Sequence, residues 1–453
     1  MNATQATNLI YRGSVLYIIC LFCMGCGNHR PDPGNNAIVP DSSECIQKDS
    51  FPKTSANNQI SDKDSTAVPP SFQPKGVDVH FDGHLIRPNI KVKGIYITGA
   101  TASTKRMNEL IDLVTSTEMN AIVLDIKNDG GNITYNIDFN DAKQYGACIR
   151  YVRDMPQLLK NLHEKGVYVI GRIVCFKDPL LAKARPELAL CKADGKPVTD
   201  GKGLPWVNPF KQEVWEYICG LAEQATLDGF DEIQFDYVRF PIGDDANRAV
   251  FGVSLDSCSR ECGLNNFFKY MEHRLHKKNI IYGADLFGTV IGSDIDRDRT
   301  GQDYVDIAKM TDNICPMVYP SHYGPKTFGI PVPDANPYQT ILKAMRLSKE
   351  ELSKDSLPKA VVRPWLQCFS APWVSGHIAY GSEQIRQQIQ AVYDAGYDEW
   401  ILWNASNKYG HVKSALTKKK NQNIEEGNQQ SDEKEIKEEK NDSIEEIRID
   451  SIH

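Results

Sequence analysis

Two aspartates in runs typical of buried β-strands are the residues best placed to do chemistry in this sequence. Asp236 lies within Glu232-Ile-Gln-Phe-Asp-Tyr-Val-Arg239, and Asp285 lies within Ile280-Ile-Tyr-Gly-Ala-Asp-Leu-Phe287. A parallel strand that is covered on both faces is almost entirely apolar, so a carboxylate near its end is informative. Two carboxylates on neighbouring strand ends are the minimal set for cleaving a glycosidic bond, one as nucleophile or base and the other as acid.

The surroundings of Asp236 favour the role of nucleophile. Arg239 follows three residues later, and a nearby guanidinium keeps a carboxylate ionised, as a nucleophile must be. The alternative is an Asp–Arg pair that only fixes the loop. For Asp285, the alternatives to an acid are a capping residue and a ligand for a sugar hydroxyl. Because side chains alternate along a strand, we assign one polar face to the interior of the fold: Glu232, Gln234 and Asp236.

Further polar residues fall near the ends of other strand-like runs. Asp125 and Lys127 share one face of the run Ala121–Lys127, where they either bind substrate hydroxyls or form a structural ion pair. Trp206, Trp365 and Trp373 either stack on sugar rings or pack in the core. The full set of predicted substrate-binding residues is Asp125, Lys127, Arg172, Arg239, Tyr319, His322, Gln367 and Asn404.

Eight strand-like runs carry these residues. They cover 94–98, 121–127, 168–176, 232–239, 280–287, 313–319, 360–367 and 399–404. Amphipathic stretches typical of helices alternate with them, at 105–118, 155–165, 212–227, 304–311 and 383–395. This alternation predicts an α/β fold, a (β/α)8 TIM barrel over residues 91–416, with long loops at 178–209 and 241–265. A doubly wound open sheet is the competing fold, but no glycine-rich phosphate loop follows the first strand.

Six segments in order resemble the bacterial glycoside hydrolases of domain-of-unknown-function family 4015. They are Lys93–Gly99, Asn120–Lys127, Gly229–Pro241, Cys315–Tyr323, Arg363–Gln367 and Leu402–Ser406. The resemblance covers nearly the whole predicted barrel. It implies a TIM barrel distantly similar to the α-amylase and α-galactosidase superfamilies. In those superfamilies the aspartate of strand four is the nucleophile, and this role carries over to Asp236.

The acid follows the family pattern less closely. The amylase-like pattern has a Glu after strand five, where this chain has Asp285, and the galactosidase-like pattern has an Asp after strand six, where we find none. Cys368 follows Gln367 at a place where an acidic residue is common in the family. Two hypotheses follow. The protein is a glycoside hydrolase that cuts a poly- or oligosaccharide, or it is a non-catalytic glycan-binding or envelope-organising lipoprotein.

Composition argues against several other classes of protein. The 453 residues include 52 Lys and Arg against 59 Asp and Glu, a net charge of −7, so no basic excess favours nucleic acid. The 12 cysteines are few for a disulfide scaffold, and the pair Cys258 and Cys262 supplies only half of a closed zinc site. The sequence has no paired histidines on an early strand, no Gly-x-Ser-x-Gly elbow and no phosphate loop. We therefore predict a carbohydrate partner, with no metal and no cofactor; the sequence does not indicate a protein partner.

The two ends of the chain differ in composition from the barrel region. Residues 1–26 resemble an export signal, with Arg12 before the apolar run Val15–Met24. Cys23-Met-Gly-Cys26 is similar to a bacterial lipobox, so we predict lipidation at Cys26 and a membrane-anchored lipoprotein of the bacterial cell envelope. The alternatives are an ordinary cleaved signal and an anchor formed by the apolar run. Residues 27–90 are predicted to be a disordered, flexible tether, and residues 417–453 a charged, disordered tail.

Overall fold

The computed structural model describes residues 79–81, 86–255, 258–357 and 360–416. The predicted signal segment with Cys26, residues 27–78 of the predicted tether and the charged tail lie outside the described residues. Two short antiparallel strands, β1 (Val79–Phe81) and β2 (Ile86–Pro88), fall inside the segment that the sequence assigns to the tether.

Eight parallel strands form a closed barrel, as the sequence predicts. They are β3 (Lys93–Ile97), β4 (Ala121–Lys127), β7 (Tyr168–Val174), β9 (Glu232–Asp236), β11 (Tyr282–Phe287), β12 (Asn313–Met317), β14 (Trp365–Gln367) and β15 (Trp400–Trp403). The last strand pairs with the first, from Trp400 opposite Lys93 to Leu402 opposite Ile95, so the sheet closes on itself. The fold is a TIM barrel, and the open doubly wound sheet is excluded.

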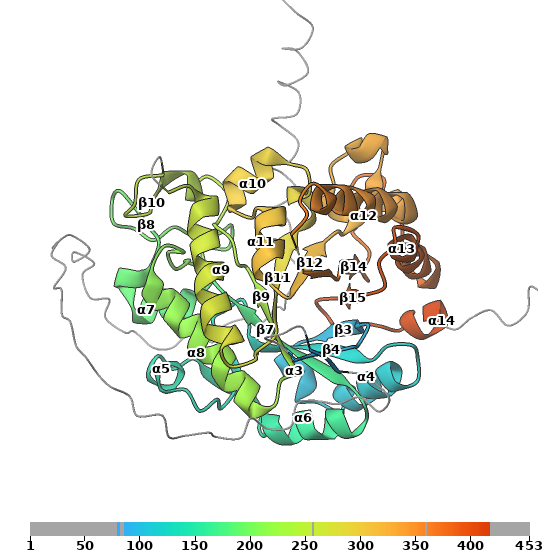
Figure 1. The fold of residues 1–453 in the computed structure, drawn as a ribbon, viewed down its shortest axis with the longest axis horizontal. Coiled ribbons are helices and arrows are strands. Elements are labelled where there is room, and N and C mark those ends of the chain that lie inside the picture. Colours follow the sequence, from blue (N-terminus) through green and yellow to red (C-terminus); the bar gives the residue numbers. More distant parts are fainter. Residues whose placement is uncertain (1–78, 82–85, 256–257, 358–359, 417–453) are drawn as a thin grey trace, which may run out of the picture.

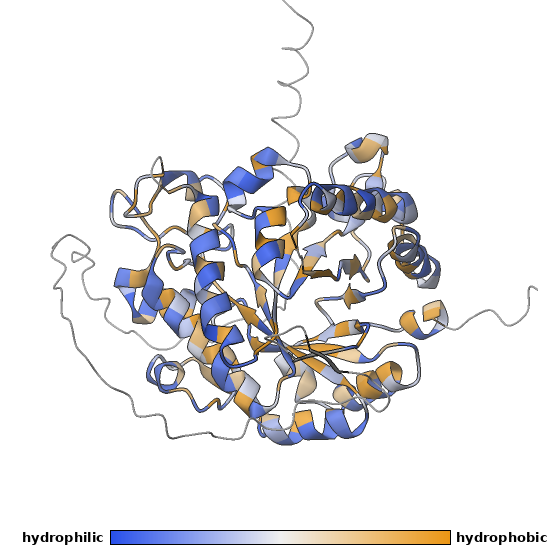
Figure 2. Cartoon of the chain, viewed as in Figure 1, coloured by the Kyte–Doolittle hydropathy of each residue, from blue (hydrophilic) through white to orange (hydrophobic). Residues whose placement is uncertain are grey.

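Helices surround the barrel between its strands (Figure 1). In chain order they are α3 (Gly99–Ala102), α4 (Arg106–Thr115), α5 (Asn140–Gln144), α6 (Met155–Glu164), α7 (Pro179–Ala184), α8 (Gln212–Asp228), α9 (Arg260–His276), α10 (Asp294–Thr300), α11 (Tyr304–Met310), α12 (Pro337–Ser353), α13 (Ser382–Asp394) and α14 (Val412–Leu416). The five amphipathic stretches in the sequence correspond to α4, α6, α8, α11 and α13. Figure 2 shows mainly hydrophobic strands inside helices that have hydrophilic outer faces, the pattern of a sheet covered by helices.

Short additional strands extend the barrel. β5 (Ile133–Tyr135) pairs antiparallel with the end of β4, and β6 (Cys148–Val152) pairs with β5. β13 (Val361–Val362) pairs with β12 shortly before β14 begins. β8 (Cys191–Lys192) and β10 (Ala249–Val250) pair with each other. They belong to the two long loops predicted after strands three and four, so these loops meet at the carboxyl-terminal face of the barrel.

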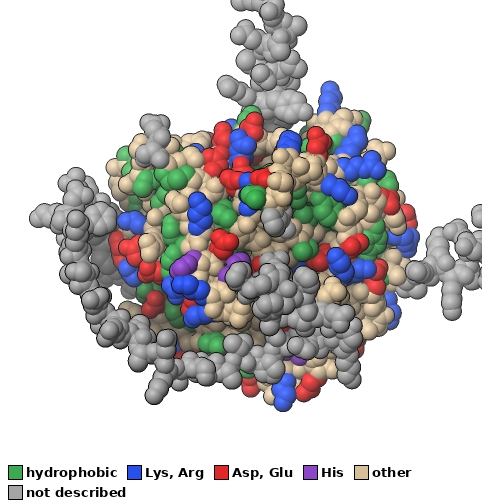
Figure 3. Space-filling view, in the orientation of Figure 1, with side chains coloured by type: hydrophobic (Ala, Val, Ile, Leu, Met, Phe, Trp, Pro, Cys, Tyr) green, Lys and Arg blue, Asp and Glu red, His purple; other side chains and the backbone are tan. Residues whose placement is uncertain are grey.

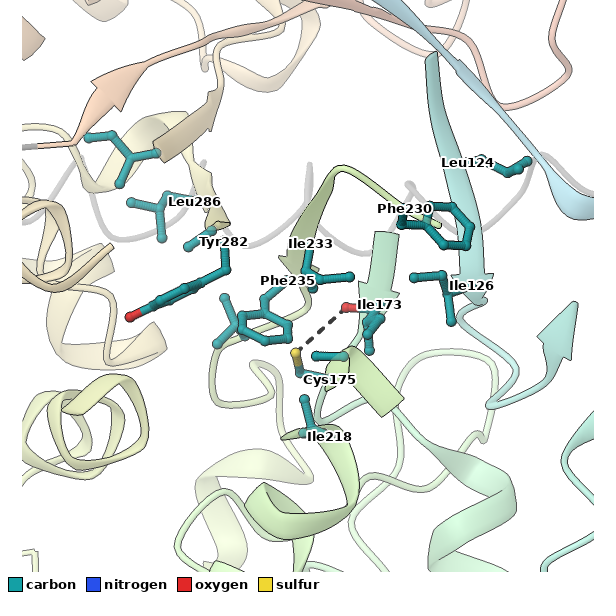
Figure 4. Packing of buried hydrophobic residues seen from close by; sticks show 14 of the residues in the cluster. Leu124, Ile126, Ile173, Cys175, Ile218, Phe230, Ile233, Phe235, Tyr282 and Leu286 are labelled. Carbon is teal, nitrogen blue, oxygen red and sulfur yellow. Dashed lines mark hydrogen bonds between the residues drawn. The ribbon is translucent and has the colours of Figure 1, made fainter. Parts of the chain in front are cut away.

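Apolar side chains form two layers of core. The larger layer lies between strands and helices, and Figure 4 shows part of it, including Ile233 and Phe235 of β9 and Ile218 of α8. The smaller layer fills the barrel and includes Tyr96, Val123, Ile170, Cys315, Trp365 and Ile401. The polar residues of β9 face this interior, as predicted. There Glu232 contacts Arg363, Gln234 contacts Asp285, and Asp236 contacts Arg172.

The surface and the cysteines add three observations. Cys258 and Cys262 form a disulfide at the start of α9, so this pair is not a half-set of metal ligands. Charged side chains of both signs are interspersed over the face shown in Figure 3. Among the helices that the structure describes, none is both long and apolar enough to cross a bilayer.

Candidate active site

Asp236 is the last residue of β9 and lies at the carboxyl-terminal end of the barrel. Its Oδ2 atom accepts hydrogen bonds from Arg172 Nε at 2.8 Å and from Arg172 Nη2 at 2.5 Å. Its Oδ1 atom accepts a hydrogen bond from the backbone N–H of Tyr237 at 2.6 Å. Tyr237 has a φ of +48°, an uncommon conformation for a residue with a side chain and one that clusters at functional sites. Donors on both oxygens suit a carboxylate that carries negative charge.

The arginine that pairs with Asp236 comes from a neighbouring strand. The sequence predicts Arg239 beside Asp236 and makes Arg172 a substrate contact. In the structure Arg172 points into the barrel from β7, which is hydrogen-bonded to β9, and its side chain is 4% exposed. Its Nη1 atom also donates to Asp125 Oδ1 at 2.7 Å, while Tyr96 donates to Asp125 Oδ2 at 2.7 Å. Arg172 therefore holds two of the predicted site aspartates and is a positioning residue.

Asp285 lies on β11, the other neighbour of β9, and is 1% exposed. Trp365 Nε1 donates to Asp285 Oδ1 at 2.6 Å, and Gln234 Nε2 donates to the same oxygen. Burial raises the pKa of Asp285 well above its ordinary value, and the negative charge of Asp236 raises it further. Asp285 therefore keeps its proton at pH values where an ordinary aspartate has lost it.

The two aspartates thus place the same functional group in two different environments. Asp236 lies in an ion pair with Arg172, while Asp285 is bonded only to neutral donors among the described residues. Carboxyl groups whose environments separate them in this way can serve as an ionised nucleophile or base and a protonated acid.

Lys127 does not join this group. The pairing of β4 with β7 shifts register between Asp125 and Lys127, as at a β-bulge, so the two residues no longer share a face. Lys127 is fully buried, with Nζ 2.5 Å from Asp178 Oδ2 and 5.5 Å from the ring centre of Tyr217 on α8. Of the two alternatives for Lys127, the structure shows an ion pair, and we remove Lys127 from the candidate substrate contacts.

Gln367 and Asn404 hold loops in place. Gln367 is fully buried, its Oε1 atom accepts from the Ser321 N–H at 3.0 Å, and its Nε2 atom donates to Asp334 Oδ1 at 2.9 Å. The Asn404 amide donates to the carbonyl oxygen of Cys368 at 2.6 Å. Because both amides are engaged by protein groups, we assign them a structural role in place of the predicted substrate contact.

Tyr319 lies on the side of the barrel near the aspartates, and His322 packs against Tyr319. Burial raises the pKa of Tyr319 well above its ordinary value, and the charges of Asp285 and Asp236 add to the shift, so the phenol is near both carboxylates. Tyr319 meets the ring of His322 edge-on, with centroids 5.0 Å apart. Burial lowers the pKa of His322 to about 3, so its imidazole is neutral.

The three tryptophans that the sequence singles out have different environments. Trp206 is 2% exposed and lies 4.9 Å from the guanidinium of Arg239, so it packs inside the protein. Trp365 is 1% exposed and donates to Asp285, so it supports the site from within the barrel. Trp373 is 43% exposed on the loop after β14 and is the member of this set that a sugar ring can reach.

Sequence reasoning missed Tyr96, Trp403 and Asp334. The Tyr96 hydroxyl donates a hydrogen bond to Asp125, and its ring stacks on that of Trp403 with ring centres 4.2 Å apart. The sequence alone does not distinguish such aromatic residues in barrel strands from core residues. Asp334 lies in a short 3₁₀ helix, Pro333–Ala335, in the loop after β12. Asp334 follows strand six, but it is so far from the strand end in the sequence that the sequence pattern does not mark it as a residue of that strand end. The loop after β12 brings Asp334 back to Gln367.

The fold and this geometry define a TIM-barrel protein with two aspartates, in contrasting environments, at the mouth of the barrel. A family model described as a putative glycosyl hydrolase domain, domain-of-unknown-function family 4015, matches residues 94–409. This match covers well over half of the chain, and the chain belongs to that family. The resemblance seen in the sequence is thereby confirmed.

Several solved structures are similar to this chain to different degrees. The glycoside hydrolase domain of PgaB (BpsB) from Bordetella bronchiseptica is 12% identical, with a TM-score of 0.53 over 73% of this chain and 100% of that chain. A hypothetical protein from Ruminiclostridium thermocellum is 34% identical over 42% of this chain and 97% of that chain, with a TM-score of 0.39. An α-galactosidase from Thermus thermophilus is 13% identical over 73% and 62% of the two chains, with a TM-score of 0.41. None of the curated proteins matches the chain.

Proposed function

We propose that this protein is a glycoside hydrolase that cleaves a poly- or oligosaccharide with Asp236 as nucleophile and Asp285 as general acid. The observation that carries this proposal is the contrast between two aspartates on adjacent strands. One is ion-paired to Arg172, and the other has a pKa raised by burial. Membership of the glycosyl hydrolase domain family supports the same reaction class.

In the first step, the Asp285 proton passes to the glycosidic oxygen as the bond between that oxygen and the anomeric carbon breaks. A carboxylate oxygen of Asp236 forms a bond to the anomeric carbon. Arg172 and the Tyr237 N–H orient that carboxylate, and Arg172 in turn is held by Asp125. In the second step, water displaces Asp236 while the ionised Asp285 takes a proton from the water, which restores both groups.

We also propose that the protein is exported and anchored to a membrane of the bacterial cell envelope through Cys26. The support is the signal-like segment 1–26 with its lipobox-like end. The disulfide between Cys258 and Cys262 is consistent with an oxidising compartment, because disulfides rarely persist in a reducing cytosol.

The test of the reaction is an assay for new reducing ends with a panel of polysaccharides and the purified protein. We expect Asp236→Asn to lower the rate on the active substrate by roughly 10³-fold or more, because no other residue takes over the nucleophile's role. Asp112→Asn is the matched control, since it makes the same chemical change on the exposed face of α4 and is expected to be neutral.

Undiminished hydrolysis by Asp236→Asn would contradict the mechanism. Sugar affinity that survives this substitution, with no product formed by either protein, would instead favour a non-catalytic glycan-binding lipoprotein. The resemblance seen in the sequence implies an acidic residue where this chain has the buried Cys368, and this difference keeps the second candidate in the test.

A further inference from the structure

Trp373 stands on the same face of the barrel as the two aspartates. It belongs to the loop between β14 and α13, which leaves the carboxyl end of β14. In a TIM barrel, that end of every strand opens on the face where ligands bind. The 43% exposed indole is therefore accessible to a ligand that enters the mouth.

A chain of aromatic rings joins Trp373 to the aspartates. Trp373 stacks on Phe369, with ring centres 6.2 Å apart and planes 19° apart. The ring of Phe369 meets that of Tyr319 edge-on, with ring centres 6.0 Å apart. Tyr319 follows β12, which pairs with β11 and sets Cys315 opposite Asp285, and the charges of Asp285 and Asp236 act on the Tyr319 phenol and raise its pKa. Two ring-to-ring steps thus lead from the aspartates to the exposed indole, and that indole is stacked on Phe369 through one face.

The mouth is chemically asymmetric. Rings gather on the side formed by β12, β14 and β15, and we call Tyr319, Phe369, Trp373 and Trp403 the aromatic sector. The side formed by the loops after β4 and β7 carries ion pairs, and the rings on that side, Trp206 and Tyr237, pack against the cations of Arg239 and Lys177. There Lys177 lies 3.4 Å from Asp129 and 3.2 Å from Asp200. Flat apolar rings bind the C–H faces of sugars, while paired charges are already satisfied by each other, so a neutral glycan is expected to lie along the aromatic sector.

The loop that carries Trp373 is fixed at both ends by one buried residue. Asp334 accepts hydrogen bonds from Gln367 at 2.9 Å, just before the loop, and from the N–H of Ile378 at 3.3 Å. The hydroxyl of Tyr380 donates to the backbone carbonyl of Asp334 at 2.9 Å. A loop that is already held in place before binding loses little conformational entropy when a ligand binds to it.

We propose that Trp373 forms a sugar-binding subsite outside the catalytic centre, so that the protein binds a neutral glycan chain of several units along the aromatic sector. This inference rests on the proposed function, because the chain must also reach Asp236 and Asp285. It selects extended glycans over disaccharides as the substrate class.

The experiment measures binding to the full chain carrying Asp236→Asn, so that turnover does not interfere. The probes are the disaccharide and the hexasaccharide of the cello-, chito- and malto- series, titrated by calorimetry. We expect at least one hexasaccharide to bind more tightly than its disaccharide. Adding Trp373→Ala is then expected to weaken hexasaccharide binding about tenfold and to leave disaccharide binding unchanged. Thermal unfolding should change only slightly, because the side chain is partly exposed and stacks on Phe369 through one face.

Tyr151→Ala is the matched control, since Tyr151 is an aromatic residue 39% exposed on β6, away from the aromatic sector. Three results would overturn the proposal: no preference of the Asp236→Asn protein for any hexasaccharide, equal affinity with and without Trp373, or an equal loss for both glycan lengths. The mechanism is tested separately by the turnover assay with Asp236→Asn, so a failure of this subsite and a failure of the proposed function are distinguishable.

Discussion

At the scale of single residues, the environment of Asp285 decides its chemistry. Burial and the charge of Asp236 raise its pKa, so the folded state binds its proton more tightly than the unfolded state does. Stability therefore falls as the pH rises from the ordinary aspartate range toward the folded pKa. We expect Asp285→Asn to raise the unfolding temperature at pH 7, to leave it unchanged at pH 3, and to lower kcat by roughly 10²–10⁴-fold. Calorimetry at both pH values and the reducing-end assay measure these effects; a destabilised variant at pH 7 would contradict the assignment.

The hydrogen bonds on Asp285 make a second prediction at the same scale. Gln234 donates to Asp285 Oδ1, which stabilises the ionised form and lowers the pKa. Replacing Gln234 with Met removes this donor and keeps a similar shape. The pKa of Asp285 then rises, so the protonated acid persists to higher pH. We expect the alkaline limb of the pH–rate profile to move up by about half to one pH unit. A downward shift of the alkaline limb would refute the role of Asp285 as the acid.

At the scale of elements, the bulge in β4 gives Lys127 a structural role and keeps it out of the candidate active site. It turns Lys127 toward Asp178, at the start of α7, and away from Asp125 at the mouth. Lys127→Met leaves a buried carboxylate unpaired, and we expect it to lower the free energy of unfolding by roughly 3–5 kcal/mol in urea. The double variant Lys127→Met/Asp178→Asn should recover much of this loss. Glycan affinity should stay unchanged in both, and a selective loss of affinity in a protein of normal stability would restore Lys127 to the binding site.

At the scale of the whole molecule, the barrel lies between a signal-like segment and a charged tail that are outside the described residues. The lipobox-like sequence predicts that Cys26 carries the anchor. We expect Cys26→Ala to move the protein from the membrane fraction to the soluble fraction of a bacterial host, as judged by fractionation and immunoblotting. Cys45→Ala is the matched control, because it replaces a nearby cysteine outside the lipobox-like segment. Retention of the Cys26→Ala protein in the membrane would point to an anchor formed by the apolar run.

The elements and the fold class of this protein could be predicted from its sequence. Eight strand-like runs appear as eight barrel strands, because hydrophobic periodicity and strand length are local properties of the chain. The inward direction of Asp236 also followed from alternation along a single strand. The family emerged from segments such as Gly229–Pro241, whose residue order is itself the evidence.

Which residues meet could be seen in the folded structure but not in the sequence. Arg172, and not Arg239, was revealed as the partner of Asp236 in an ion pair, because strand neighbours in a closed barrel are not neighbours in sequence. A one-residue bulge reversed the direction of Lys127, and no local pattern in the sequence signals it. The raised pKa of Asp285 depends on burial and on Asp236, both of which exist only after the barrel has closed. Contacts between strands and the dielectric environment are properties of the assembled fold, so they are absent from any single run of residues.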